Sequence, residues 1–152
     1  MYKKILVALE NGPADTHLLP HICQLARQVG AELLLLHVAD GWAARNFEQL
    51  KLAESDEMRA DRDYLESTAT RLRQGGLRVD TRLALGNPPT EIIKIAASEH
   101  CDLIALASHG HKLIGDLLHG STIDKVRHET NIPLLVVNAS KLATKPPFQS
   151  TK

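Results

Sequence analysis

The chain begins with a short block of apolar residues that is set between polar ones. Residues 5–9 (Ile-Leu-Val-Ala-Leu) follow two lysines and precede a turn-forming Glu-Asn-Gly-Pro segment at 10–13. A continuous apolar run, in contrast to an alternating one, indicates burial on both faces. The run therefore predicts a parallel strand that is covered by helices.

Helical periodicity follows this strand. Apolar residues recur three or four positions apart between Leu18 and Val29, and Gly30 comes next, a residue type that commonly ends helices. Asp15 or Thr16 is suited to capping the start. Because Pro20 is tolerated only near the first turn, we expect the helix to begin close to residue 16.

Strand and helix patterns continue to alternate along the chain. Further strands are predicted at 32–38, 78–85, 103–107 and 133–137, and helices at about 47–74, from Pro88 onward, and around 121–128. The buried stripe of the helix after Pro88 is predicted as Ile92, Ile93, Ala96 and Ala97. The strand at 78–85 alternates polar and apolar residues, as an edge strand does. This order favours a parallel sheet with right-handed crossovers and helices on both faces.

Composition narrows the class of function. The 152 residues are 43% hydrophobic, enough for one domain with a core, which we place at 1–139 with a flexible C-terminal tail at 140–152. Eighteen basic and 18 acidic residues give no net charge, and aromatics are 3%, so neither coating nor stacking of nucleic acid is expected. Cys23 and Cys101 are interpreted as buried apolar residues. No signal-peptide or membrane-spanning pattern is present, so we expect a cytoplasmic protein without a membrane partner.

Candidate chemistry is concentrated after the fourth predicted strand. There the chain reads Ala107-Ser108-His109-Gly110, then nine residues, then Gly120-Ser121-Thr122 at the start of a helix. Glycines let a backbone approach an anion closely, and the amides and dipole of a helix N-terminus favour negative charge. Ligands of open α/β sheets bind beyond the carboxyl ends of strands. The segment therefore predicts a polyphosphate site, while neither a GxGxxG nor a GxxxxGK[ST] motif occurs.

At this loop the sequence resembles the universal stress protein family, specifically its ATP-binding branch, whose signature is G-x2-G-x9-G-[S/T]. Gly110, nine residues and Gly120-Ser121 match the signature, and Ala107 stands where its first glycine is usual. The opening residues 3–7, the strand end at 36–38 and the closing strand at 133–137 extend the resemblance over nearly the whole domain. It implies an adenine nucleotide alpha-hydrolase-like fold, a five-stranded parallel sheet of order 3-2-1-4-5 with helices on both faces, and ATP with Mg²⁺ as the ligand.

The resemblance also implies which residues surround the nucleotide. Ala8, Leu9 and Glu10 flank the nucleoside, Val38 meets the adenine through its backbone, Leu106 and Ala107 lie beneath the ribose and phosphates, and His109, Gly110, Gly120, Ser121 and Thr122 hold the phosphates. Two of these positions depart from the family pattern. Glu10 replaces an aspartate, and Ala107 replaces a glycine, which is unfavourable only where positive φ is required.

Several side chains allow a second interpretation. Glu10 is either a solvated loop carboxylate or a group that contacts ribose hydroxyls or a divalent cation. His109, His111 and His119 share one loop without cysteine or carboxylate at ligand spacing, so no dedicated metal site is predicted. His37 is interpreted as a core histidine with satisfied hydrogen bonds. No nucleophile arrangement or arginine clamp is recognisable, so catalytic residues are not predicted and turnover is at most slow ATP hydrolysis.

Three functional hypotheses follow. The leading one is a stress-response protein whose ATP occupancy acts as a switch for partner interactions. The first alternative is a dimeric interaction module that does not bind nucleotide, and the second is a hydrolase of nucleotide or phosphoester bonds centred on Ser121. The short apolar strand Pro133 to Val137 ends the topology and is expected at a sheet edge, where a second copy of the chain would protect it.

Overall fold

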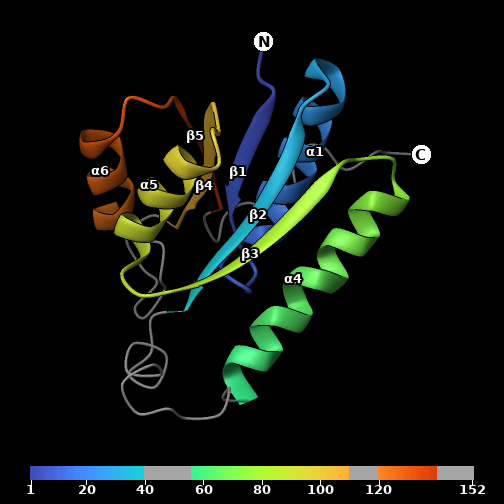
Figure 1. Ribbon diagram of the computed structural model, residues 1–152, viewed down its shortest axis with the longest axis horizontal. Helices are drawn as coiled ribbons and strands as arrows, with labels where there is room; N and C mark the ends of the chain where they lie inside the picture. The colour runs from blue at the N-terminus through green and yellow to red at the C-terminus, as the bar shows by residue number, and fades with distance from the viewer. Residues whose placement is uncertain (40–55, 110–119, 140–152) are drawn as a thin grey trace.

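The computed structural model describes residues 1–39, 56–109 and 120–139. Within them, one parallel sheet has the strand order β3-β2-β1-β4-β5 (Figure 1). Its strands are β1 Lys4–Ala8, β2 Glu32–Ala39, β3 Val79–Leu85, β4 Leu103–Ser108 and β5 Leu134–Asn138. The predicted fold class and the implied strand order are both confirmed.

Helices cover both faces of the sheet (Figure 1). The helices of the described residues are α1 Asp15–Val29, α4 Asp56–Gln74, α5 Pro88–Ser98 and α6 Gly120–Glu129. Helices α1 and α4 lie on one face, and α5 and α6 lie on the other. The predicted end of the long helix at Gln74 is confirmed, whereas its predicted start at residue 47 lies outside the described residues. No described helix has the length and apolarity needed to cross a membrane.

The central strands supply two separate cores. Side chains of β1, β2 and β4 alternate between the faces, and both sets are buried, which explains the continuous apolar runs of the sequence. Beneath α1 and α4 lie Ile5, Val7, Leu33, Leu35 and Ala105, together with Leu18, Ile22 and Leu65 of the helices. Beneath α5 and α6 lie Leu6, Leu34, Leu36, Ile104 and Leu106, together with Ile92, Ala96 and Val126.

The two edge strands differ from the central ones. In β3, Val79 is buried and Thr81 and Leu83 on the same face are half-buried, while Asp80 and Arg82 on the other face are exposed. The alternation in the sequence therefore marks an edge strand, as predicted. Strand β5 forms the opposite edge and pairs with β4 in parallel register, for example Leu106 with Val136. Val136 is 44% exposed.

The start of α1 corrects one prediction. Ala14 occupies the N-cap position, and no side chain caps the helix there. Thr16 donates its hydroxyl hydrogen bond to the carbonyl of Pro13, and the Asp15 carboxylate turns back toward the preceding loop. At the other end, the predicted stop is confirmed, because Gly30 has φ 71° and its N–H donates to the carbonyl of Ala26.

The buried stripe of α5 is also partly different from the prediction. Ile92 and Ala96 are buried as expected, but Ile95 completes the stripe, Ile93 is half-buried and Ala97 is exposed. Positions 92, 95 and 96 follow the three- and four-residue spacing of one helix face. The prediction was wrong for Ala97 because that position points away from the sheet.

Candidate functional site

The carboxyl ends of β1 and β4 lie side by side at the centre of the sheet. The chain runs outward from β1 through β2 to β3 and then returns to place β4 on the other side of β1. The strand order therefore reverses between β1 and β4, which is where open α/β sheets bind their ligands. The first residue after β1, Leu9, donates its backbone N–H to Leu36 at 2.8 Å and so keeps the strand direction beyond Ala8.

A histidine and a carboxylate meet across this reversal point. His109, which follows β4, has its Nε2 2.5 Å from Oε2 of Glu10, which follows β1. Each side chain is only 6% exposed. The interpretation of Glu10 as a solvated loop carboxylate is therefore wrong. The contact joins the two strand ends that the sequence assigned to one site.

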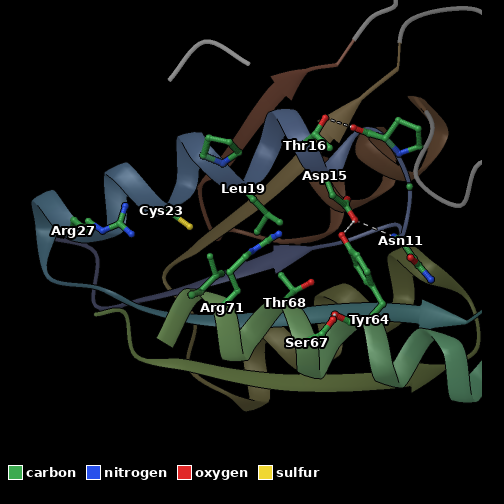
Figure 2. Close-up of a pocket in the computed structure, with 14 residues that line it drawn as sticks. Asn11, Asp15, Thr16, Leu19, Cys23, Arg27, Tyr64, Ser67, Thr68 and Arg71 are labelled. Carbon is green, nitrogen blue, oxygen red and sulfur yellow. Dashed lines mark hydrogen bonds between the residues drawn. The ribbon is translucent and has the colours of Figure 1, made fainter. Parts of the chain in front are cut away.

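A second carboxylate, in the first turn of α1, fixes the loop after β1. Asp15 is only 2% exposed, and its carboxylate accepts hydrogen bonds from the backbone N–H groups of Glu10 and Asn11, at 3.0 Å each. It also accepts the Tyr64 hydroxyl of α4 at 2.5 Å (Figure 2). Burial, then the hydrogen bond to Asp15, raise the pKa of Tyr64 well above its usual range, so this hydroxyl stays a donor. Three donors stabilise the buried negative charge.

Asn11 links the same loop to a buried contact between a histidine and a carboxylate. Its backbone has φ 59°, a left-handed conformation that asparagine adopts more readily than most residues. Its Nδ2 donates to Oδ1 of Asp61 at 2.8 Å, and Oδ2 of Asp61 lies 3.3 Å from Nε2 of His37. Nδ1 of His37 lies 2.8 Å from the carbonyl oxygen of Leu9, which can only accept, so Nδ1 carries a proton. The prediction of a satisfied core histidine is confirmed.

These contacts form one chain of hydrogen bonds that surrounds the end of β1. It runs from Leu9 through His37, Asp61 and Asn11 to Asp15 and Tyr64. Two of its members, Asp61 and Tyr64, belong to α4, and both fix residues that directly follow β1. The conformation of the loop at Glu10 is thus set from α1, β2 and α4 together.

The residues predicted to bind ATP fall into three groups. The first group is buried at the carboxyl ends of β1, β2 and β4 and consists of Ala8, Leu9, Val38, Leu106 and Ala107. The second group, Glu10 and His109, is in mutual contact just beyond these strand ends. The third group forms the first turn of α6 and consists of Gly120, Ser121 and Thr122. Ser121 is exposed and Thr122 is buried. Gly110, like His111 and His119, lies outside the described residues. ATP binding by these residues stays a prediction.

The substitution of glycine by alanine at 107 causes no backbone conflict. Among the described non-glycine residues only Asn11 and His100 have positive φ, so Ala107 keeps the ordinary backbone of a β-strand. Its methyl group is fully buried in the core beneath α1, together with Leu9 and Val137. The alanine therefore meets none of the strain that a positive φ would impose.

Asn11, Asp61 and Tyr64 were missed by sequence reasoning. One signal was available for Asp61, which is buried and shares the inward stripe of α4 with Leu65, Ala69 and Leu72. A carboxylate on an apolar helical stripe requires a buried partner. No group of three or more histidine, cysteine or acidic side chains in the described residues is arranged to hold a metal.

Comparison with known proteins places the chain in a family. The family model described as the universal stress protein family matches residues 1–138. Universal stress protein MJ0577 of Methanocaldococcus jannaschii is 31% identical over 157 aligned positions, which cover 90% of this chain and 95% of that protein.

Solved structures agree with this sequence match. The structure of MJ0577 superposes with a TM-score of 0.71 at 30% identity, covering 91% of this chain and 96% of the other. A universal stress protein of Archaeoglobus fulgidus in complex with dAMP has a TM-score of 0.65 at 18% identity, over 90% of this chain and 98% of that one. A universal stress protein in complex with cAMP has a TM-score of 0.64 at 15% identity, over 90% and 97%. Because the family model spans every described helix and strand, the chain belongs to the universal stress protein family.

Proposed function

We propose that the protein binds ATP with Mg²⁺ at the strand-order reversal and that nucleotide occupancy acts as a switch for partner interactions. Two structures of the same fold carry adenine nucleotides, dAMP and cAMP, which supports an adenine ligand for this fold. The observation that carries the proposal is the contact of Glu10 with His109 at the carboxyl ends of β1 and β4.

The residues at this place fit an adenosine phosphate in their chemistry. Glu10 supplies a carboxylate acceptor suited to ribose hydroxyls, and its loop is held rigidly by Asp15. The first turn of α6 supplies backbone N–H groups and the hydroxyls of Ser121 and Thr122, which suit phosphate oxygens. His109 adds a ring nitrogen beside the Glu10 carboxylate. An entering nucleotide would compete with His109 for the Glu10 carboxylate, so binding would rearrange the end of β4.

Mg²⁺ enters this proposal as a companion of the nucleotide. The described residues offer no ready-made cluster of metal ligands, and Mg²⁺ commonly retains several waters and binds through substrate phosphates. When bound, it would neutralise phosphate charge, while the chain's own residues orient the nucleoside and hold the phosphate oxygens. We therefore expect Mg²⁺ alone to bind weakly and ATP affinity to increase in its presence.

Calorimetric titration of ATP into the purified protein, with Mg²⁺ or with EDTA, tests the proposal. Replacing Ser121 with alanine removes one hydroxyl donor to a charged group and should weaken ATP binding about tenfold. The matched control is Ser98→Ala, whose hydroxyl donates to the carbonyl of Ile95 in α5. Absence of any heat or melting-temperature shift at millimolar ATP with Mg²⁺ would reject nucleotide binding and favour the alternative of an interaction module without nucleotide.

We further propose that two copies of the chain pair through the last strand. Strand β5 is an edge strand whose Leu134 and Leu135 are half-buried and whose Val136 is 44% exposed. An apolar edge is prone to pair with another strand, and a two-fold mate would cover it. Light scattering should report a dimer that Val136→Glu converts to a monomer, while Asn131→Glu, exposed outside the strand, leaves it dimeric. A monomeric mass of the unmodified protein at micromolar concentration would contradict this part of the proposal.

A further inference from the structure

A groove separates α1 from α4 on the face of the sheet that these helices cover (Figure 2). Its volume is about 920 Å³, within the range of pockets that hold small organic ligands. One end is formed by the loop after β1, at Asn11, Gly12 and Pro13, and the walls by facing residues of α1 and α4. The groove is thus distinct from the phosphate-binding turn proposed on α6, which covers the other face.

Two guanidinium groups enter this groove from opposite walls. Arg27 comes from α1 and Arg71 from α4, and Figure 2 shows Cys23 between them. Arg27 reaches across to the end of α4, where its Nη2 lies 3.1 Å from the position that a Cβ on Gly75 would occupy. Neither arginine forms an ion pair with a described residue. The groove is therefore lined by two positive charges, neither of which is paired with a carboxylate of the described residues.

The acidic residue of the lining, Asp15, forms no ion pair with either arginine in the described chain. Its carboxylate accepts hydrogen bonds from two backbone N–H groups and from the Tyr64 hydroxyl. The thiol of Cys23 lies close enough to both arginines for their charges to affect its pKa. Burial raises the pKa of its thiol, while the charges of Arg27 and Arg71 both act to lower it.

Between the two ends the lining is apolar with hydroxyl groups at its margin. Leu19, Pro20 and Leu72 form the apolar part, and Thr16, Ser67 and Thr68 supply hydroxyls. A groove lined by apolar surface and two guanidinium groups is complementary to a molecule with an apolar body and an anionic head, because guanidinium binds carboxylate and phosphate oxygens through two parallel hydrogen bonds.

We propose that the groove between α1 and α4 is a second ligand site, for a small organic anion with an apolar body, whose anionic head is bound by Arg27 and Arg71. The site is independent of the ATP proposal, since it uses neither the end of β4 nor the first turn of α6. Its proximity to Asp15 and Asn11 places the ligand against the residues that hold the loop after β1.

The test uses the full chain and the fluorescent probe 8-anilinonaphthalene-1-sulfonate, an aromatic sulfonate. We expect saturable binding of one dye per chain, with displacement by decanoate at about tenfold lower concentration than by uncharged 1-decanol. Replacing both Arg27 and Arg71 with glutamine should raise the dissociation constant about tenfold or more. Arg59→Gln is the matched control, because Arg59 is exposed on α4 outside the groove and pairs with Asp56.

A second pair of variants keeps both arginines. Ser67→Glu adds a carboxylate to the groove at an exposed position and should repel the dye, whereas Thr70→Glu adds the same charge to an exposed position of α4 outside the lining and should not. Melting temperatures establish that each variant is folded. Unchanged dye affinity in folded Ser67→Glu, or in the arginine double variant, would overturn the proposal.

Two further outcomes also contradict a separate small-molecule site. Complete displacement of the dye by ATP, retained in Ser121→Ala, would assign the arginines to the nucleotide. Dye binding that falls as protein concentration rises, together with a doubled mass in light scattering, would make the groove an interface with a second copy of the chain. Failure of ATP binding with intact dye binding would reject only the nucleotide proposal.

Discussion

The hydroxyl of Tyr64 donates a 2.5 Å hydrogen bond to the buried carboxylate of Asp15, 49 positions earlier in the chain. The contact joins α4 to the start of α1. The same carboxylate accepts hydrogen bonds from the backbone amides of Glu10 and Asn11, so the Tyr64 hydroxyl stabilises the loop after β1 indirectly, through Asp15. A residue in the middle of α4 thereby helps to position the point of strand-order reversal, where open α/β sheets bind ligands.

Replacing Tyr64 with phenylalanine should lower the free energy of unfolding by about 1–3 kcal/mol. The substitution keeps the ring but removes one of three donors from a buried charged acceptor, and hydrogen bonds to charged groups lie at the upper end of the usual range. Urea denaturation measures the change. Tyr2→Phe is the control, because the hydroxyl of Tyr2 makes no hydrogen bond to a described residue, and we expect a loss of less than about 0.5 kcal/mol. Equal effects of the two variants would contradict a stabilising role for the Asp15 contact.

Asn11 combines a left-handed backbone with a side-chain hydrogen bond, and two variants separate them. Asn11→Gly loses the bond to Asp61 but tolerates φ 59°, whereas Asn11→Ala loses the bond and is strained. We expect alanine to be less stable than glycine by about 1 kcal/mol, the usual penalty of a left-handed residue with a Cβ. Thermal and urea unfolding give the comparison. An alanine variant as stable as the glycine variant would show that backbone strain at this position is negligible.

Gly30 and Gly12 provide a matched test of backbone conformation. Neither glycine has an atom within 4 Å of the position a Cβ would occupy, but Gly30 has φ 71° at the end of α1. Gly30→Ala should cost about 1–2 kcal/mol in unfolding free energy, since no space is lacking and only the left-handed conformation resists the side chain. Gly12→Ala should be close to neutral. A neutral result at Gly30 would mean that the helix ends differently in solution.

The ion pair of Lys4 with Glu99 predicts a pH dependence of stability. Nζ of Lys4 lies 3.1 Å from Oε2 of Glu99, and Arg82 also contacts this carboxylate. The hydrogen bond and charge of Lys4 hold the pKa of Glu99 below its ordinary 4.5. A carboxylate with a lowered native pKa stabilises the fold above its ordinary pKa, and this contribution is lost as pH falls through the native value.

Glu99→Gln should therefore be less stable than the unmodified protein at pH 7, with the difference shrinking toward about pH 3 as the native carboxylate is protonated. Urea denaturation at both pH values measures it. Glu129→Gln, at an exposed residue of α6 without an ion pair among the described residues, should show a much smaller difference at pH 7. A Glu99 effect that persists unchanged at low pH would have to arise from packing.

Most of the fold could be predicted because its signals are local. Continuous apolar runs at residues 5–9 and 103–107 fix buried parallel strands, and alternation at 78–85 fixes an edge. Each predicted strand end lies within one residue of the observed end. These patterns follow from which faces are buried, and that information lies within each segment.

The hydrogen-bonded surroundings of β1 could not be predicted in the same way. Asn11, Asp15, Asp61 and Tyr64 lie in separate segments, and their contacts depend on how α4 packs beside α1. The sequence offers Asp15 as one of two candidates for the helix cap, with Thr16, because such residues are preferred at helix starts. In the folded chain the loop amides of Glu10 and Asn11 compete for the same carboxylate and are its partners.

Cys23 and Cys101 lie in different cores, one beneath α1 and α4 and the other beneath α5 and α6, with the sheet between them. Burial raises the pKa of both thiols, that of Cys101 to about 11, so both react slowly in the closed structure. The two sulfur atoms are thus natural reporters of local breathing motions. Alkylation rates followed at each position would reveal whether the helical layers on the two sides of the sheet loosen together or one at a time.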